Sequence, residues 1–209
     1  MDGTLFETAP ELSDSINLML KDLKMAELEK DEIKNFIGKG AENLINQSIK
    51  FSSKKDPSLF FTKAEKLFDQ HYSLHSRKSH MFDGVEKTIA DLKSKGFLLG
   101  CVTNKPTHYT TALMKESRLI ESMDIIVSGD TTEKKKPDPL PIQYALNQLT
   151  IGAKEAIMVG DSCVDIEAGF AAGTYIVTVP YGYQYGESII SDKVDYAMSH
   201  FKELTQIIN

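Results

Sequence analysis

Residues 97–105 have the sequence FLLGCVTNK, an apolar run of strand length that ends in polar side chains. Residues 156–165, AIMVGDSCVD, repeat this arrangement and reach an aspartate, with a second aspartate four residues later. Short, almost wholly apolar runs bounded by turn residues are typical of strands buried on both faces of a parallel sheet. These two segments therefore indicate an α/β fold.

Amphipathic helices separate such strands throughout the second part of the chain. Apolar runs predict strands at 97–102, 124–127, 156–159 and 175–179. Helical periodicity predicts helices at 85–95, 107–118, 140–149 and 164–172. This alternation predicts a Rossmann-like core in which a parallel sheet is covered by helices on both faces. In such cores, functional groups collect at the carboxyl ends of the strands.

The N-terminal third lacks a convincing strand and carries apolar residues at helical spacing. Examples are Ile16, Met19 and Leu20, then Leu44, Ile45 and Ile49, then Leu67, Phe68 and Tyr72. We interpret these stripes as the packing faces of helices. The sequence therefore predicts a small all-helical cap domain at 13–79, inserted after the first motif of a core formed by 1–12 and 80–209.

Composition narrows the class of protein. The chain has 209 residues and a net charge of −6, whereas a generic nucleic-acid binder is expected to be basic. No apolar run approaches the ~18–20 residues that span a bilayer, so neither a nucleic acid nor a membrane is an expected partner. The two cysteines, Cys101 and Cys163, form no disulfide framework, and no secretory signal is visible. We therefore expect a cytoplasmic protein.

Polar residues suited to phosphate chemistry follow the predicted strands. Thr103 ends the first strand, Asp161 and Asp165 follow the third, Lys136 lies between them, and Asp2 stands near the N-terminus. If these segments meet at one edge of the sheet, three carboxylates crowd together and repel one another unless a cation neutralises them. Oxygen ligands of this kind suit Mg²⁺, which also bridges to phosphate oxygens. A lysine and a hydroxyl would hold the remaining phosphate oxygens, so these residues predict phosphoryl transfer with Mg²⁺.

Four short segments resemble, in order, the four motifs of the haloacid dehalogenase superfamily of phosphatases. They are Asp2-Gly3-Thr4-Leu5, VTNKP at 102–106, Lys136-Pro137, and GDS at 160–162 with Asp165. The resemblance covers nearly the whole chain. Within that superfamily, YGYQYGE at 181–187 and IGKGA at 37–41 are similar to the tail and to the cap specificity loop of phosphoglycolate phosphatases.

This resemblance implies a covalent mechanism. An aspartate attacks phosphorus and forms an aspartyl-phosphate, which water then hydrolyses. Asp2 matches the second aspartate of the first motif, which protonates the leaving oxygen and then activates the water. Thr103 would donate to a phosphate oxygen with support from Asn104, and Lys136 would offset charge on the nucleophile and the phosphoryl group.

The resemblance also implies metal ligands and substrate contacts. Mg²⁺ would be bound by Asp161, by Asp165 directly or through water, and by the backbone carbonyl of Asp2. Lys39, in the cap loop, would grip a substrate carboxylate or would be an ordinary exposed lysine. The tyrosines at 181–185 would form a wall of the substrate pocket or a rigid turn packed near the site.

The first motif departs from the superfamily pattern Asp-x-Asp-Gly-Thr. The nucleophile belongs two positions before Asp2, which places it before residue 1, and the apolar strand that carries it in the middle of the sheet is also absent. Three explanations remain open. The recorded start lies too late, at an internal methionine; or the protein is catalytically dead; or the register shifts, so that Asp2 becomes the nucleophile and Thr4 takes the acid/base position.

The sequence therefore predicts a Mg²⁺-dependent phosphatase of a small phosphorylated metabolite, most similar to phosphoglycolate phosphatase. Two alternatives stay open. One is a phosphatase of another small metabolite or of pyrophosphate. The other is a catalytically dead or truncated homologue that binds a phosphorylated ligand or a partner. The sequence gives no indication of the oligomeric state.

Overall fold

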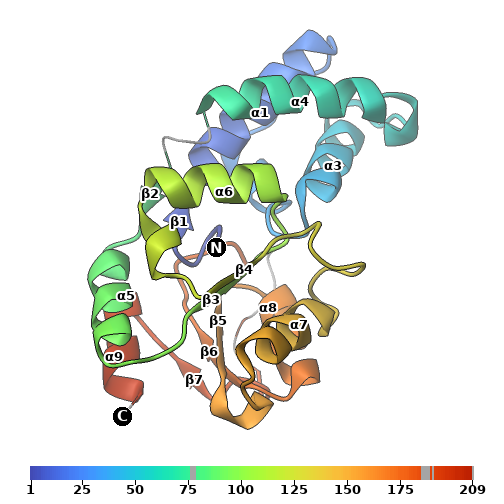
Figure 1. Cartoon of the computed structure of the whole chain (residues 1–209). Helices are drawn as coiled ribbons and strands as arrows, with labels where there is room; N and C mark the ends of the chain where they lie inside the picture. Colours follow the sequence, from blue (N-terminus) through green and yellow to red (C-terminus); the bar gives the residue numbers. More distant parts are fainter. Residues whose placement is uncertain (76–78, 185–188, 190, 209) are drawn as a thin grey trace.

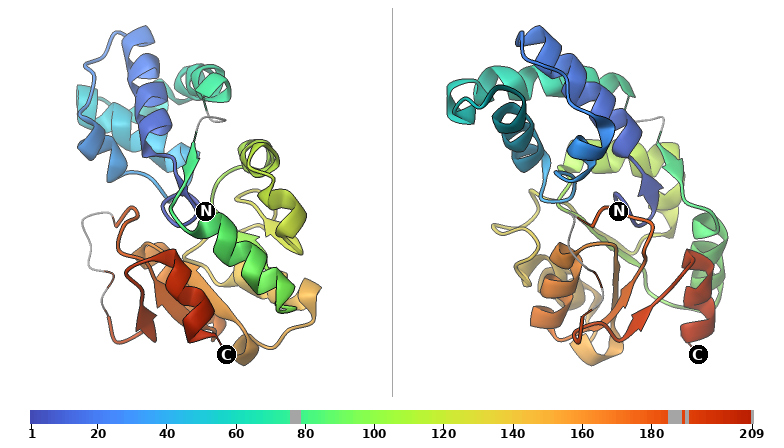
Figure 2. Two further views of the ribbon diagram at one scale, coloured as in Figure 1. Left: turned by 90° about the vertical axis from the view of Figure 1, so that its left-hand side faces the viewer. Right: turned by 180° about the vertical axis from the view of Figure 1, so that it is seen from behind.

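Two parts of the chain, a helical cap and an α/β core, are joined by a pair of short strands. The computed structural model describes residues 1–75, 79–184, 189 and 191–208. Strand β1 (Phe6–Glu7) leaves the core and strand β2 (His80–Met81) returns to it, and the two pair antiparallel with Phe6 opposite Met81. The N-terminus lies between the two parts (Figures 1 and 2).

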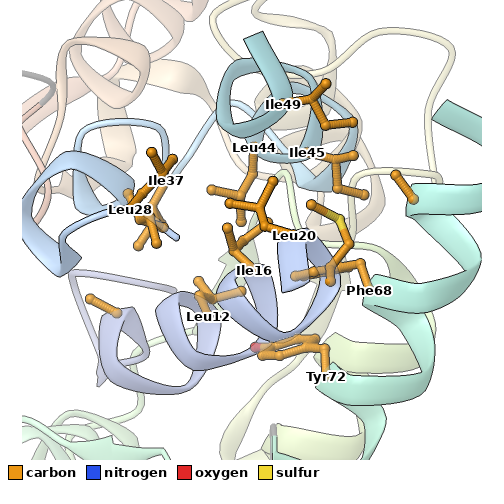
Figure 3. Close-up of a cluster of buried hydrophobic side chains, with 14 of the residues drawn as sticks. Leu12, Ile16, Leu20, Leu28, Ile37, Leu44, Ile45, Ile49, Phe68 and Tyr72 are labelled. Atoms are coloured by element: carbon orange, nitrogen blue, oxygen red, sulfur yellow. The ribbon is translucent and has the colours of Figure 1, made fainter. Parts of the chain in front are cut away.

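The cap is a cluster of helices around its own apolar core. Its elements are α1 (Ala9–Asp22), α2 (Lys30–Lys34), α3 (Ala41–Ser53), the 3₁₀ helix η1 (Pro57–Leu59) and α4 (Phe61–His75). Pro10 lies in the first turn of α1, where its missing N–H and fixed φ suit a helix start. The predicted stripes face inward, because Ile16, Leu20 and Ile49 are fully buried where α1, α3 and α4 meet, with Tyr72 at one edge of the cluster (Figure 3). The all-helical cap is therefore confirmed, although α1 begins before the predicted boundary at residue 13.

The core contains the predicted alternation of strands and helices. Its strands are β3 (Gly100–Val102), β4 (Ile125–Val127), β5 (Ile157–Gly160), β6 (Tyr175–Thr178) and β7 (Tyr196–Ala197). Its helices are α5 (Val85–Ser94), α6 (Thr107–Glu116), α7 (Leu140–Leu149), α8 (Cys163–Ala172) and α9 (Leu204–Ile207), with short 3₁₀ turns η3 (Leu119–Ser122), η4 (Ala153–Glu155) and η5 (Phe201–Glu203). Helices α5 and α9 lie on one side of the strands, and α7 and α8 on the other (Figure 1). All pairs among β3 to β7 are parallel, as expected.

The sheet differs from the expected single sheet because it is divided. Strand β3 pairs with β4, and β5 pairs with β6 and β7, but no ladder joins β3 to β5 among the described residues. A cavity of about 580 Å³ lies between them, lined by strand residues that include Cys101, Val102, Ile157 and Val159, with Met1 beside it. Three of these four side chains are only half-buried, which is unusual for strands at the centre of an α/β sheet.

The fold leaves the carboxyl ends of β3 and β5 facing the cap. The polar segments that follow these two strands therefore lie beside the N-terminal segment and beneath the cap helices.

None of the described helices is both long and apolar enough to cross a membrane.

Candidate active site

A small cavity of about 50 Å³ lies between the cap and the core. The core contributes Asp2, Thr103, Asn104, Lys105, Lys136, Asp161 and Asp165 to its lining, and the cap contributes Gly38, Gly40, Phe68 and Tyr72 among others. The structure thus brings together six of the seven residues singled out from the sequence. The seventh, Lys39, is exposed and is not among the described lining residues, although both of its neighbours are.

Lys136 and Asp165 form a buried ion pair at the base of the cavity. Lys136 Nζ lies 2.7 Å from Asp165 Oδ1 and also donates to the carbonyl oxygen of Val102 at 2.7 Å. The other carboxylate oxygen of Asp165 accepts from the hydroxyl of Ser162 at 2.8 Å, as a capping residue at the start of α8. Burial raises the pKa of Asp165, but the Lys136 ammonium, the Met1 amino group and the hydrogen bond from Ser162 together outweigh burial and hold that pKa below its usual range.

Asp161 is buried without a cationic partner within ion-pair distance in the described part of the chain. Its carboxylate accepts from the hydroxyl of Thr4 at 2.6 Å and from the backbone N–H of Tyr183 at 2.6 Å. Burial, together with the charge of Asp165, raises the pKa of Asp161 to about 7. Asp161 does not cap the following helix, because the capping position belongs to Ser162.

Glycines make room for these carboxylates. A Cβ added at Gly3 or at Gly182 would overlap the side chain of Asp161, and one added at Gly160 would overlap that of Asp165. Gly3 also has φ of +74°, a left-handed conformation that glycine adopts without strain. The first motif and the tail are therefore shaped around the Asp161 carboxylate.

Asp2 faces a different cation. Lys105 Nζ lies 3.1 Å from Asp2 Oδ1 and 3.4 Å from Oδ2, and it donates to the hydroxyl oxygen of Tyr72 at 2.6 Å. Burial opposes the charge of Asp2, but Lys105 and the nearby amino group of Met1 hold the pKa of that carboxyl below its usual range. Burial likewise raises the pKa of Tyr72 to about 12, so its phenol stays protonated.

Thr103 and Asn104 continue from the end of β3 into the cavity, and both are buried. The Thr103 hydroxyl oxygen accepts from the backbone N–H of Lys105 at 3.2 Å, which leaves its proton for another acceptor. The Asn104 side chain bonds both backbone groups of Lys136, at 2.9 and 2.8 Å, and donates to the carbonyl oxygen of Gly38 in the cap at 3.0 Å. Asn104 therefore fixes the Lys136 segment and contacts the cap.

Among the described residues, two of the three carboxylates on the cavity are paired with a lysine, and the third is not. Asp2 is paired with Lys105 and Asp165 with Lys136, while Asp161 keeps a carboxylate whose pKa is raised by burial. No group of three or more acidic, histidine or cysteine side chains is gathered as a metal site within the described ranges. A hard divalent cation fits the remaining oxygen donors, because carboxylates of Asp161 and Asp165 plus backbone oxygens and water are ligands that Mg²⁺ accepts. A cation there would stabilise the ionised form of Asp161, whose pKa is raised.

Sequence reasoning missed two residues of this arrangement, Lys105 and Tyr72. Lys105 directly follows the predicted pair Thr103-Asn104, but nothing in the sequence shows which way its side chain points. Tyr72 was assigned to a packing stripe, although a buried phenol also needs a polar partner. Tyr183 belongs to the segment expected to form a pocket wall or a rigid turn. It is buried and lines the cavity, and its hydroxyl accepts from the backbone N–H groups of residues 8 and 9 at 2.7 and 2.8 Å. Tyr185 lies outside the described residues.

Known proteins are similar to this chain in sequence and in fold. A family model described as haloacid dehalogenase-like hydrolase matches residues 1–179. The chain is 37% identical to a phosphoglycolate phosphatase of Nitrosospira multiformis, over all of this chain and 92% of that protein. It is 33% identical to one of Nitrosococcus oceani, over all of this chain and 94% of that protein.

A solved structure extends the likeness to three dimensions. The crystal structure of a protein named as a predicted phosphoglycolate phosphatase from Haemophilus somnus superposes with a TM-score of 0.91 at 27% identity. The superposition covers all of this chain and 95% of that chain. The CbbY protein of Rhodobacter sphaeroides, solved in complex with phosphate, has the same fold with a TM-score of 0.83 at 22% identity, covering 98% of this chain and 93% of that one.

Proposed function

The chain belongs to the haloacid dehalogenase-like hydrolases, and from this premise we propose that it is a Mg²⁺-dependent phosphatase of small phosphomonoesters, with 2-phosphoglycolate as the first candidate substrate. The relatives at 37% and 33% identity are named phosphoglycolate phosphatases. The observation that carries the proposal is the buried Asp161 carboxylate, left without an ammonium partner next to the Lys136–Asp165 pair. A divalent cation and a phosphate group together fit that charge pattern.

The residues that line the cavity would each make a different contact with a bound phosphate. Lys136 lies at the base and contributes a fixed positive charge, while the Thr103 hydroxyl keeps a proton that it can donate to a phosphate oxygen. Mg²⁺, held by Asp161 and Asp165, would neutralise the phosphate oxygens. The small volume between cap and core favours a leaving group of few atoms and excludes bulk water.

We assign proton transfer to Asp2, on the side of the cavity that faces the cap. Its motif position in the family implies that it protonates the leaving oxygen and afterwards activates water. The carboxylate is ionised in the chain without ligand, so it must take up a proton before the first of these steps. Lys105 holds this carboxylate at 3.1 Å. The substrate carbon chain would then lie toward Tyr72 and Phe68 of the cap, which line the same cavity.

The attacking carboxylate of the proposed mechanism belongs two positions before Asp2, a position that precedes residue 1 of the 209. A second candidate function is binding of a phosphorylated ligand without turnover, which the Lys136 ammonium and the Thr103 hydroxyl support equally. Both candidates need the same phosphate and cation contacts, and they differ only in whether phosphate is released.

Phosphate release from 2-phosphoglycolate separates the two functions. The assay uses the 209-residue chain and a form in which a short apolar strand ending in Phe-Asp directly precedes Met1, each in Mg²⁺ and in EDTA. We expect Mg²⁺-dependent release by the extended form at a rate at least roughly a hundredfold above the 209-residue chain, the scale on which a catalytic carboxylate acts. The matched control carries asparagine in place of the added aspartate.

Three outcomes decide the proposal. Release by the extended form that stops in EDTA and in the asparagine control supports the phosphatase. Robust release by the 209-residue chain that is lost in Asp2→Asn would support the shifted register instead. No release by a folded extended form, with any of several small phosphomonoesters, would overturn the phosphatase and leave ligand binding.

A further inference from the structure

The Lys105 side chain links the cap to the carboxylate of Asp2. It is buried, with 4% of its side chain exposed, and its ammonium contacts Asp2 in the core and the Tyr72 hydroxyl in the cap helix α4. A buried ammonium costs free energy unless hydrogen bonds replace its lost water. Asp2 and Tyr72 supply such bonds. Their interactions with the ammonium raise the pKa of Lys105 above its ordinary value in spite of burial.

Tyr72 is held in place by aromatic packing across the same boundary. Its ring stacks on Phe68 of the cap at 5.3 Å between centroids and meets the edge of Tyr109, from core helix α6, at 4.7 Å. The Lys105 ammonium also lies 4.7 Å from the centroid of the Tyr72 ring. The phenol therefore occupies one fixed position when the cap rests on the core.

Opening the cap would carry Tyr72 away from Lys105, because α4 belongs to the cap and Lys105 to the end of β3. A water molecule would then take the place of the Tyr72 phenol oxygen next to the Lys105 ammonium. The attraction between Lys105 and Asp2 weakens as the local dielectric rises. The position of the Asp2 carboxylate therefore depends on whether the cap is closed.

We propose that Lys105 is a positioning residue that fixes the Asp2 carboxylate only when Tyr72 of the closed cap completes its coordination. The Tyr72–Lys105–Asp2 chain couples enclosure of the ligand to alignment of the carboxyl group that transfers the proton. The role of Asp2 in this statement rests on the proposed function, whereas the coupling itself is a property of the cap and core.

Amide hydrogen exchange in the 209-residue chain tests the coupling without any turnover. The amides of Thr8 and Ala9 are buried and donate to the Tyr183 hydroxyl, so they exchange when cap and core separate. Tyr72→Phe keeps the ring and removes only the hydroxyl. We expect Tyr72→Phe and Lys105→Met each to speed this exchange about tenfold, the scale of a hydrogen bond to a charged group, and the double variant to be no faster than Lys105→Met alone.

Tyr109→Phe is the matched control. It removes another tyrosine hydroxyl bond across the boundary, from Tyr109 to Asp69 at 2.6 Å, without touching Lys105. Its effect on exchange should multiply with that of Lys105→Met, because the two share no hydrogen-bond partner and Tyr109→Phe keeps the ring that packs on Tyr72. The link through Lys105 does not exist if the effect of Tyr72→Phe on the exchange rate also multiplies with that of Lys105→Met. It does not exist either if Tyr72→Phe leaves the exchange rate unchanged.

The ¹³Cγ signal of Asp2, assigned by its loss in Asp2→Asn, reports the position of the carboxylate directly. Tyr72→Phe should shift this signal, and Tyr109→Phe should leave it in place although it also loosens the cap. An Asp2 signal that moves equally in both variants would mean that Tyr72 acts only on cap stability, and that result overturns the positioning role. Neither measurement depends on phosphatase activity, so a failure here is distinct from a failure of the proposed function.

Discussion

Lys136 Nζ and Asp165 Oδ1 are 2.7 Å apart, and only 5% and 11% of the two side chains are exposed. Lys136→Met would leave the Asp165 carboxylate buried without its cation. Breaking a buried pair from one side costs about 3–5 kcal/mol, so we expect a loss of that order in the free energy of unfolding, measured in urea.

Lys134→Met is the control for this substitution. Lys134 belongs to the same run of three lysines but pairs with Asp138 at the surface, with 66% of its side chain exposed. Exposed pairs contribute about 0–1 kcal/mol. Equal losses of unfolding free energy in the two variants would show that the buried Lys136–Asp165 pair contributes no more to stability than the exposed Lys134–Asp138 pair.

Mg²⁺ binding should depend on pH through Asp161. Burial and the Asp165 charge raise the pKa of Asp161 to about 7 without metal, from an ordinary value of 3.8. Below pH 7 the folded chain therefore holds a proton that Mg²⁺ must displace. We expect calorimetric Mg²⁺ affinity to fall as pH drops from 7.5 to 5.5, by up to about tenfold per pH unit.

The same raised pKa predicts how stability varies with pH. The bound proton stabilises the folded chain fully below the unfolded value of 3.8, and this contribution is lost as pH rises through about 7. Without Mg²⁺, the free energy of unfolding should decline less between pH 5 and pH 8 in Asp161→Asn than in the unchanged chain, because the asparagine has no proton to lose. A Mg²⁺ affinity that does not change with pH would show that Asp161 does not bind the cation.

Gly3→Ala should abolish Mg²⁺ binding, because the added Cβ would overlap the Asp161 carboxylate. Gly96→Ala is a close control, since Gly96 has φ of +86° against +74° for Gly3 but nothing within 4 Å of an added Cβ. Both variants carry the backbone cost of a left-handed alanine, about 1–2 kcal/mol. Titration of Mg²⁺ should separate them, and unimpaired binding by Gly3→Ala would show that the contact with Asp161 is unimportant.

The cavity between β3 and β5 should accept an added strand. Five apolar residues placed before Met1 would cover half-buried side chains such as Val102 and Ile157. Burying an aliphatic side chain contributes about 1.5–3 kcal/mol, so we expect the free energy of unfolding to rise by several kcal/mol. A Gly/Ser extension of equal length is the control, and an equal rise with both would mean that the cavity is not filled.

The sequence predicted most of the core and the convergence of its motifs. The apolar run at 156–159 and the helical periodicity at 140–149 are strong signals, and they correspond to Ile157–Gly160 and Leu140–Leu149. The linking strands β1 and β2 were not predicted, because two residues show no period. Lys105 and Tyr72 were missed because their roles depend on where side chains from distant segments meet, which spacing along one chain does not encode.

Binding of inorganic phosphate to the 209-residue chain tests the central claim most directly, because it needs the phosphate and cation contacts but no nucleophile. Calorimetric titration in Mg²⁺ and again in EDTA compares the two conditions. The account predicts one phosphate site in Mg²⁺ and affinity at least about tenfold weaker in EDTA, a difference of ~1.4 kcal/mol. Phosphate binding of equal strength in both, or none in either, would contradict a single site built by Thr103, Lys136 and Asp161.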